Sequence, residues 1–204
     1  SNVHVKLTGL PRTITPADIT RLLASNKVRN ITKVALDYNR FEPTGGAFLT
    51  LSKPTALPNA LIALKQLRCF GHPLMPRTTP APAEPNVRSR GIKGREEASE
   101  RSIVTGNGSQ GGITDGGRSV LLSGLPGKIS PGVVRRVLKN YKLMGGEAEV
   151  VKLEADVKGA MTSRVLVRLS SASEAFRLVR DLHMTNYEPR VWQDKYIIRA
   201  RLIH

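Results

Sequence analysis

The segment Leu7–Leu23 reads LTGLPRTITPADITRLL, and the segment Leu122–Leu138 reads LSGLPGKISPGVVRRVL. Both carry the pattern LxGLPxxIxP at the same spacing, which indicates an internal duplication. In each copy, alternating apolar residues before Gly-Leu-Pro predict a strand. A Ser/Thr-Pro pair followed by spaced apolar residues then predicts a helix. We therefore expect two domains that begin with the same strand–turn–helix unit.

The rest of the first copy, residues 1–78, continues this pattern. Glu42–Gly46 has the composition of a turn, and Pro73 and Pro76 suit only an edge or irregular strand. The predicted strands are Val3–Leu10, Ile31–Asn39, Ala47–Leu51 and Leu74–Arg77. The first predicted helix begins at Thr15, and the second spans Leu57–Leu67. The predicted order is βαββαβ.

The second copy, residues 119–204, gives the same order. The predicted strands are Val120–Leu125, Glu149–Asp156, Ser163–Leu169 and Tyr196–Leu202. The predicted helices are Ser130–Leu138 and Ser171–His183, the second with Ala175, Phe176, Val179 and Leu182 facing inward. The fold class is therefore α+β.

The chain carries a formal charge of +16 over 204 residues, which favours a polyanionic partner. Residues 79–118 are rich in Pro, Gly and charge, with few large apolar side chains, so they predict a flexible linker with at most a helical turn around Arg95–Arg101. The net charge is +8 over residues 1–78, +1 over the linker and +7 over residues 119–204. The positive charge therefore lies on both folded parts.

Catalytic and metal-binding patterns are weak. The four histidines are scattered without the spacing of a zinc site, and Cys69 is the only cysteine, so no internal disulfide forms. In the segment Gly124–Ser130, two residues separate the first glycine from Gly-Lys, whereas a phosphate-binding loop requires four residues there. No stretch approaches the length of a membrane-spanning helix. We expect no enzyme activity, no cofactor and no membrane partner.

The two copies resemble the RNA recognition motif (RRM) family over residues 1–78 and 119–204. The family's hexapeptide motif falls on Val5–Leu10 and Val120–Leu125, and its octapeptide motif on Thr44–Leu51 and Thr162–Leu169. The resemblance implies two ferredoxin-like domains, each a four-stranded antiparallel sheet with two helices on one face, joined by the linker. It also implies that the other face of each sheet binds single-stranded RNA.

In this family, aromatic side chains on the two central strands stack on bases. The resemblance places these positions at Lys6, Gly46, Phe48, Leu121, Arg164 and Leu166. Because only Phe48 is aromatic, we expect RNA contact to depend mainly on cations selected by strand alternation. The candidate RNA-binding residues are Lys6, Thr8, Lys33, Phe48, Thr50, Arg77, Lys152, Arg164, Arg168, Arg199 and Arg201. Packing of Phe48 under the linker or the other domain stays open, as does a structural role for Trp192 rather than exposure to a base or partner.

The leading functional hypothesis is a non-enzymatic RNA-binding protein in which two modules, joined by about 40 flexible residues, gain affinity through effective concentration. A second hypothesis is a degenerate RRM scaffold that docks to proteins in a ribonucleoprotein or mitochondrial ribosome assembly, which the missing aromatics favour. Duplex DNA binding is a third, because charge alone does not identify the polyanion. A chain that begins at Ser1 without Met is consistent with a removed organellar presequence, so we expect a mitochondrial location, with a nuclear one as the alternative.

Overall fold

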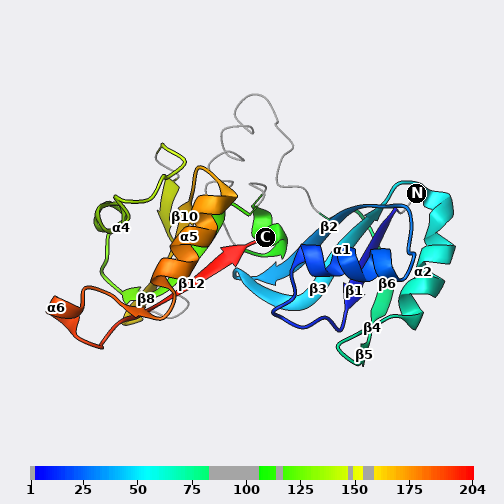
Figure 1. The fold of residues 1–204 in the computed structure, drawn as a ribbon, viewed down its shortest axis with the longest axis horizontal. Helices are drawn as coiled ribbons and strands as arrows, with labels where there is room; N and C mark the ends of the chain where they lie inside the picture. Colours follow the sequence, from blue (N-terminus) through cyan, green and yellow to red (C-terminus); the bar gives the residue numbers. More distant parts are fainter. Residues whose placement is uncertain (1–2, 83–105, 114–116, 147–148, 154–158) are drawn as a thin grey trace. The chain divides into compact units, whose positions relative to one another are not determined.

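The computed structural model describes residues 3–82, 106–113, 117–146, 149–153 and 159–204, and divides the chain into two compact units (Figure 1). Unit 1 is Ser1–Thr114 and unit 2 is Asp115–His204. The expected α+β class is confirmed: both units are antiparallel sheets with helices. No helix in the described ranges is long and apolar enough to cross a membrane.

Unit 1 is a five-stranded sheet in the order β6-β1-β3-β2-β7. Its strands are β1 His4–Thr8, β2 Ile31–Asn39, β3 Glu42–Leu51, β6 Met75–Thr79 and β7 Gly108–Ser109. A small hairpin pairs β4 Arg68–Cys69 with β5 His72–Pro73. The helices are α1 Pro16–Ser25, the short 3-10 helix η1 Pro54–Ala56 and α2 Leu57–Gln66. As its prolines predict, β6 lies at the edge of the sheet.

Alternation along the strands sends one set of side chains toward α1 and α2 and the other set to the opposite face, which we call the open face. Val5, Leu7 and Leu49 are fully buried on the helix side, with Ile19 of α1 and Leu64 of α2. Thr15 caps α1, since its hydroxyl accepts from the Asp18 amide and the Asp18 carboxylate accepts from the Thr15 amide at 3.1 Å. The Thr-Pro signal in the sequence is therefore a true helix start.

The hairpin between β2 and β3 turns at Arg40 and Phe41, so the expected turn over Glu42–Gly46 is wrong. Both turn residues have positive φ, 51° and 63°, as a tight two-residue hairpin requires. The sequence does not predict this turn, because neither Arg40 nor Phe41 is one of the residue types, such as Gly or Asn, that favour it. Phe41 is only 1% exposed, and its amide donates to the Gly106 carbonyl at 2.8 Å.

The segment Gly106–Ile113, predicted as part of the linker, is instead built into unit 1. Strand β7 pairs with β2 through Asp37↔Ser109 and Tyr38↔Gly108, and the 3-10 helix η2 Gln110–Gly112 follows it. Ile113 is 6% exposed. The prediction of a flexible linker over residues 79–118 is therefore wrong for Gly106–Ile113. Two small residues that pair as a strand and one buried apolar side chain, Ile113, are enough to hold this segment against unit 1. The predicted helical turn at Arg95–Arg101 lies outside the described residues.

Unit 2 has the sheet order β11-β12-β8-β10-β9. Its strands are β8 Ser119–Pro126, β9 Val150–Lys152, β10 Thr162–Arg168, β11 Thr185–Asn186 and β12 Ile197–Ile203. Its helices are α4 Pro131–Val137, α5 Ala172–Leu182 and α6 Pro189–Trp192, and Figure 1 shows α5 lying over the sheet alongside β12. In both units four of the five strands follow the order that the βαββαβ pattern implies, and one short strand, β7 in unit 1 and β11 in unit 2, is added at one edge.

The unit 2 core lies between this sheet and the helices. It contains Leu122, Val165 and Val167 from the strands and Leu178 from α5. Phe176, which we expected to face inward, is 59% exposed. It stands one residue, and hence about 100° of helix rotation, from the buried Ala175, whereas Leu178 continues the apolar stripe three residues on.

Candidate nucleic-acid interface

Cross-strand pairing in unit 1 aligns Arg77, Lys6 and Phe48 in one row of the open face. Lys6 of β1 pairs with Arg77 of β6 on one side and with Phe48 of β3 on the other. Directly paired residues of antiparallel strands point to the same face. The row ends at Ala35 of β2, which is 3% exposed. Arg77 is exposed and Phe48 is partly exposed.

The neighbouring rows contain the other predicted residues of unit 1. Thr50 pairs with His4 and with Lys33, and the His4 Nδ1 and Thr50 Oγ1 atoms lie 3.2 Å apart. Thr8 lies in the next row and donates its hydroxyl to the Met75 carbonyl at 3.3 Å. The structure thus brings the predicted residues of the first copy, Lys6, Thr8, Lys33, Phe48, Thr50 and Arg77, onto one face.

Sequence reasoning missed Asp37, which changes the electrostatics of this face. The Asp37 carboxylate lies 2.8 Å from the Lys6 ammonium, and its side chain is only 11% exposed. It also accepts from the Thr44 hydroxyl at 3.1 Å. Lys6 itself lies 5.1 Å from the centroid of the Phe48 ring. The lysine charge is therefore held by an ion pair beside the ring, which leaves Arg77 and Lys33 as the exposed cations.

Gly46, at a position where the family carries a stacking ring, makes room for that carboxylate. A Cβ added there would lie 3.3 Å from the Asp37 Oδ2 atom and 3.4 Å from the Asp37 Cβ. A ring at Gly46 would displace Asp37 from its place beside Lys6. In this unit the ion pair therefore occupies space that a second stacking residue would need.

In unit 2, the register places four predicted arginines on the open face. Arg164 and Arg199 both pair with Ser123, so they flank it on the two neighbouring strands. Arg201 pairs with Leu121, and Arg168 pairs with Ser119. Arg199 and Arg201 are exposed along β12, whereas Arg164 and Arg168 are partly buried. The Arg168 Nε atom is buried without a hydrogen-bond partner among the described residues.

Lys152 does not belong to this face, so the prediction that it joins the arginines there is wrong. It pairs with Val165, whose side chain is in the core, so Lys152 points to the helix side at the end of β9. Its ammonium donates to the Gly127 carbonyl at 2.6 Å. Val150 and Val151 are both apolar, so alternation could not fix the register of this strand, and an error of one residue exchanges the faces.

The centre of the unit 2 open face is apolar. Leu121 and Leu166, at two positions where the family carries rings, pair with each other and are 5% and 0% exposed. Ile203, on the same face, is 1% exposed. These side chains lie outside the core cluster between sheet and helices. Unit 2 thus presents its accessible charge along β12, beside a buried aliphatic centre.

No protein-family model matches the chain, and no curated protein is similar to it in sequence. Similar solved structures include the RNA recognition domains 1 and 2 of Sex-lethal from Drosophila melanogaster, 15% identical, with a TM-score of 0.32 and coverage of 98% of this chain and 99% of that chain. The first two RRM domains of the yeast poly(U) binding protein Pub1 are 9% identical, with a TM-score of 0.33 and coverage of 98% and 99%. The N-terminal three RNA binding domains of the yeast splicing factor Prp24 are 8% identical, with a TM-score of 0.35 and coverage of 98% and 64%. The fold assignment rests on the strand order and pairing of this chain itself.

Proposed function

We propose that the chain binds single-stranded RNA and that the open face of unit 1 is its main base-contacting surface. The row Arg77–Lys6–Phe48 carries this proposal. It sets two cations and a partly exposed ring on three adjacent strands, which lie about 4.8 Å apart. A base stacked on Phe48 brings its phosphate within reach of Arg77, so one nucleotide engages both chemistries.

Unit 2 contributes charge rather than stacking in this proposal. Arg199 and Arg201 stand exposed at alternate positions of β12, where they suit successive phosphates. Leu121 and Leu166 offer no aromatic surface to a base. Binding by this unit should therefore depend strongly on salt and weakly on sequence.

The stacking role is tested with Phe48→Ala. Stacking of one base on an aromatic side chain contributes about 1–3 kcal/mol, so we expect Kd for a short single-stranded RNA to rise about 5- to 150-fold. The matched control is Phe176→Ala, which removes an exposed ring on α5 and should leave Kd unchanged. Equal affinities of the two variants in a fluorescence-anisotropy titration would contradict the assignment of the unit 1 face.

The charge role is tested with Arg77→Ala against Lys65→Ala. Both remove one exposed cation from unit 1, but Lys65 lies in the last turn of α2, on the helix layer. Each phosphate contact to a single strand contributes about 0.7 to the slope of log Kd against log salt concentration. We expect Arg77→Ala to reduce this slope by about that amount, with no change for Lys65→Ala. A slope equally affected in both variants would mean that Arg77 acts only through net charge.

A second candidate is protein docking within a ribonucleoprotein assembly, which is favoured by the leucines that stand at Leu121 and Leu166 in place of rings that stack on bases. A gel shift with single-stranded RNA, double-stranded RNA and DNA at two salt concentrations separates the candidates. RNA binding predicts preferential retention of single-stranded RNA at the higher salt concentration. Loss of all three complexes at that concentration would favour docking to protein.

A further inference from the structure

A cavity of about 910 Å³ opens in unit 2 where β8 ends. Its walls come from Pro126–Ser130 at the end of β8, Val133 of α4, Gly159–Met161 before β10, and the loop from Tyr187 to Tyr196 that contains α6. Its volume lies within the range of about 300–1,000 Å³ that small-ligand sites occupy. We call this cavity the Trp192 pocket.

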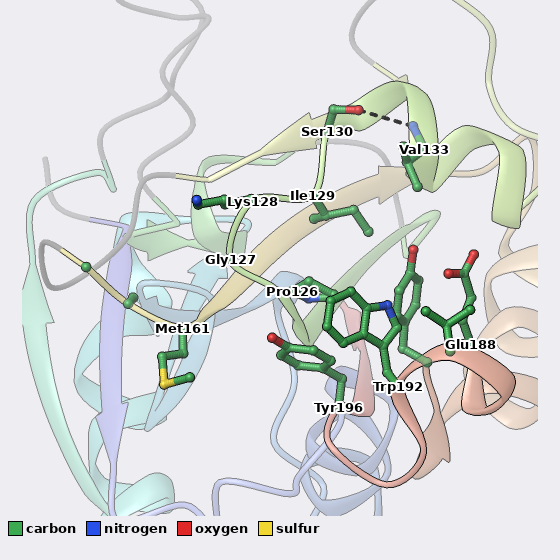
Figure 2. Close-up of a pocket in the computed structure, with 14 residues that line it drawn as sticks. Pro126, Gly127, Lys128, Ile129, Ser130, Val133, Met161, Glu188, Trp192 and Tyr196 are labelled. Atoms are coloured by element: carbon green, nitrogen blue, oxygen red, sulfur yellow. Dashed lines mark hydrogen bonds between the residues drawn. The ribbon is translucent and has the colours of Figure 1, made fainter.

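Two aromatic rings form the central wall of the pocket. Trp192 and Tyr196 meet edge to face, with centroids 5.3 Å apart and planes at 79°. Trp192 is 37% exposed, whereas Tyr196 is 8% exposed, so the second ring supports the first from beneath. Figure 2 shows Trp192 beside Pro126, with Met161 on one side of the pocket and Glu188 on the other. The indole therefore does not plug the core: it is an accessible ring in a recessed site.

One cation lies close to these rings. The Lys195 ammonium lies 5.6 Å from the Trp192 centroid and 5.5 Å from the Tyr196 centroid. Lys128 lies in the exposed loop that forms one rim, and Lys152 donates to the Gly127 carbonyl in the same wall. Glu188 is the one acidic residue among the lining residues. A ring with positive charge close by suits a ligand that is flat and apolar at one end and anionic at the other.

We propose that the Trp192 pocket binds one base of a single-stranded RNA, with Lys128 and Lys195 facing the adjoining phosphates; this rests on the proposed RNA-binding function. The base stacks on the exposed face of the indole. The lysines supply the sequence-independent part of the contact, as in other single-strand sites that combine a ring with basic residues.

Continuity with the basic face of unit 2 favours RNA over an apolar peptide as the occupant. Pro126 stands three residues along β8 from Ser123, which Arg164 and Arg199 flank on either side. At about 3.3 Å per residue, Pro126 lies at most about 10 Å along β8 from Ser123. One strand of RNA can therefore contact both with neighbouring nucleotides, whereas a purely apolar peptide gains nothing from the adjacent cations.

Trp192 is the only tryptophan of the chain, so its fluorescence reports directly on the pocket. The experiment titrates the full chain with homopolymeric ten-nucleotide single-stranded RNAs of each base, following Trp192 emission and, in parallel, the anisotropy of labelled RNA. We expect binding to quench the emission with the same midpoint as the anisotropy change. We also expect Trp192→Ala to raise Kd about 5- to 150-fold, the range for one stacked base. Trp192→Phe should retain most of the affinity.

Two further variants keep the test independent of folding. Lys195→Gln leaves both rings in place and should reduce the salt slope by about 0.7, the contribution of one phosphate contact. Met184→Ala, a control in unit 2 with a 59% exposed side chain outside the pocket lining, should leave Kd unchanged. RNA that binds without quenching, and equally well to Trp192→Ala, would overturn the pocket while leaving the proposed function intact. Absence of RNA binding by the unaltered chain would instead overturn the proposed function itself.

Discussion

Gly124, the glycine of the repeated pattern in unit 2, allows a sharp test of why this pattern decides the fold. Its φ is +84°, and a Cβ added there would overlap the carbonyl oxygen of Ile197, the first residue of β12. Gly9 in unit 1 repeats the arrangement, with a φ of +90° and the Pro73 carbonyl oxygen 2.8 Å from the site of an added Cβ. In both units the glycine lets the first strand pass close against the backbone that leads into the last strand.

The cost of Gly124→Ala has two separable parts. A left-handed φ costs a residue with a Cβ about 1–2 kcal/mol. Forcing an atom into space held by backbone adds about 1–3 kcal/mol. Gly145→Ala is the matched control, because Gly145 has a φ of +90° but nothing within 4 Å of an added Cβ. We expect the free energy of unfolding of unit 2 to fall by about 2–5 kcal/mol for Gly124→Ala and by about 1–2 kcal/mol for Gly145→Ala.

The sole tryptophan lies in unit 2, so urea titrations followed by Trp192 fluorescence measure the stability of that unit in the full chain. Equal midpoints for Gly124→Ala and Gly145→Ala would refute the close approach to β12. Such a result would leave only the conformational preference of glycine to explain the motif. A lower midpoint for Gly124→Ala at unchanged m-value would support the approach, because m reflects the surface exposed on unfolding.

Four other outcomes follow from particular contacts. Gly106→Ala, with φ +74° and an added Cβ 2.7 Å from the amide nitrogen of Phe41, should expose that amide to hydrogen exchange as the segment leaves β2, whereas Gly108→Ala, with no atom in reach, should not. Asp37→Asn removes the anion beside Lys6, so RNA affinity and the salt slope should both increase in anisotropy titrations. Burial, reinforced by the charge of Asp18, raises the pKa of the Cys69 thiol above 9.0, so alkylation at pH 8 should be slow until urea unfolds unit 1. Burial, then the charge of Glu188, raises the pKa of Tyr187 above 10.0 in the folded state; the folded chain therefore holds this proton more tightly, and urea midpoints should fall as the pH rises past 10.0.

Local sequence signals predicted the parts of the fold that depend on local chemistry. The alternation of Val5 and Leu7 fixed the faces of β1, and the Ser/Thr-Pro pairs marked both α1 and α4. The placement of Lys6, Phe48 and Arg77 on the open face followed from the side-chain alternation of β1, β3 and β6. These predictions succeeded because strand parity is unambiguous where apolar and polar residues strictly alternate.

The features that the sequence did not predict depend on pairings between distant residues. Asp37 is one acidic residue in an alternating strand, and its ion pair with Lys6 exists only because β1 and β2 both neighbour β3. The face of Lys152 depended on a register that two consecutive valines left open. Strand β7 contains only Gly108 and Ser109, which carry no apolar pattern, so only the partner strand reveals it. The Trp192 pocket likewise forms from three loops far apart in sequence.

The docked segment Gly106–Ile113 changes the physical basis of two-unit binding. A linker of about 40 flexible residues would give a low effective concentration of one unit near RNA held by the other, since that concentration falls roughly as the −3/2 power of linker length. Ile113 is buried in unit 1 and β8 of unit 2 begins at Ser119, so only residues 114–118 connect the two anchored points. Even fully extended, these residues span at most about 20 Å. For the proposed RNA binding, this shorter tether raises the effective concentration of one unit near RNA held by the other. Weak sites, one with a single ring and one with arginines, then suffice for useful affinity, provided that β7 remains paired with β2.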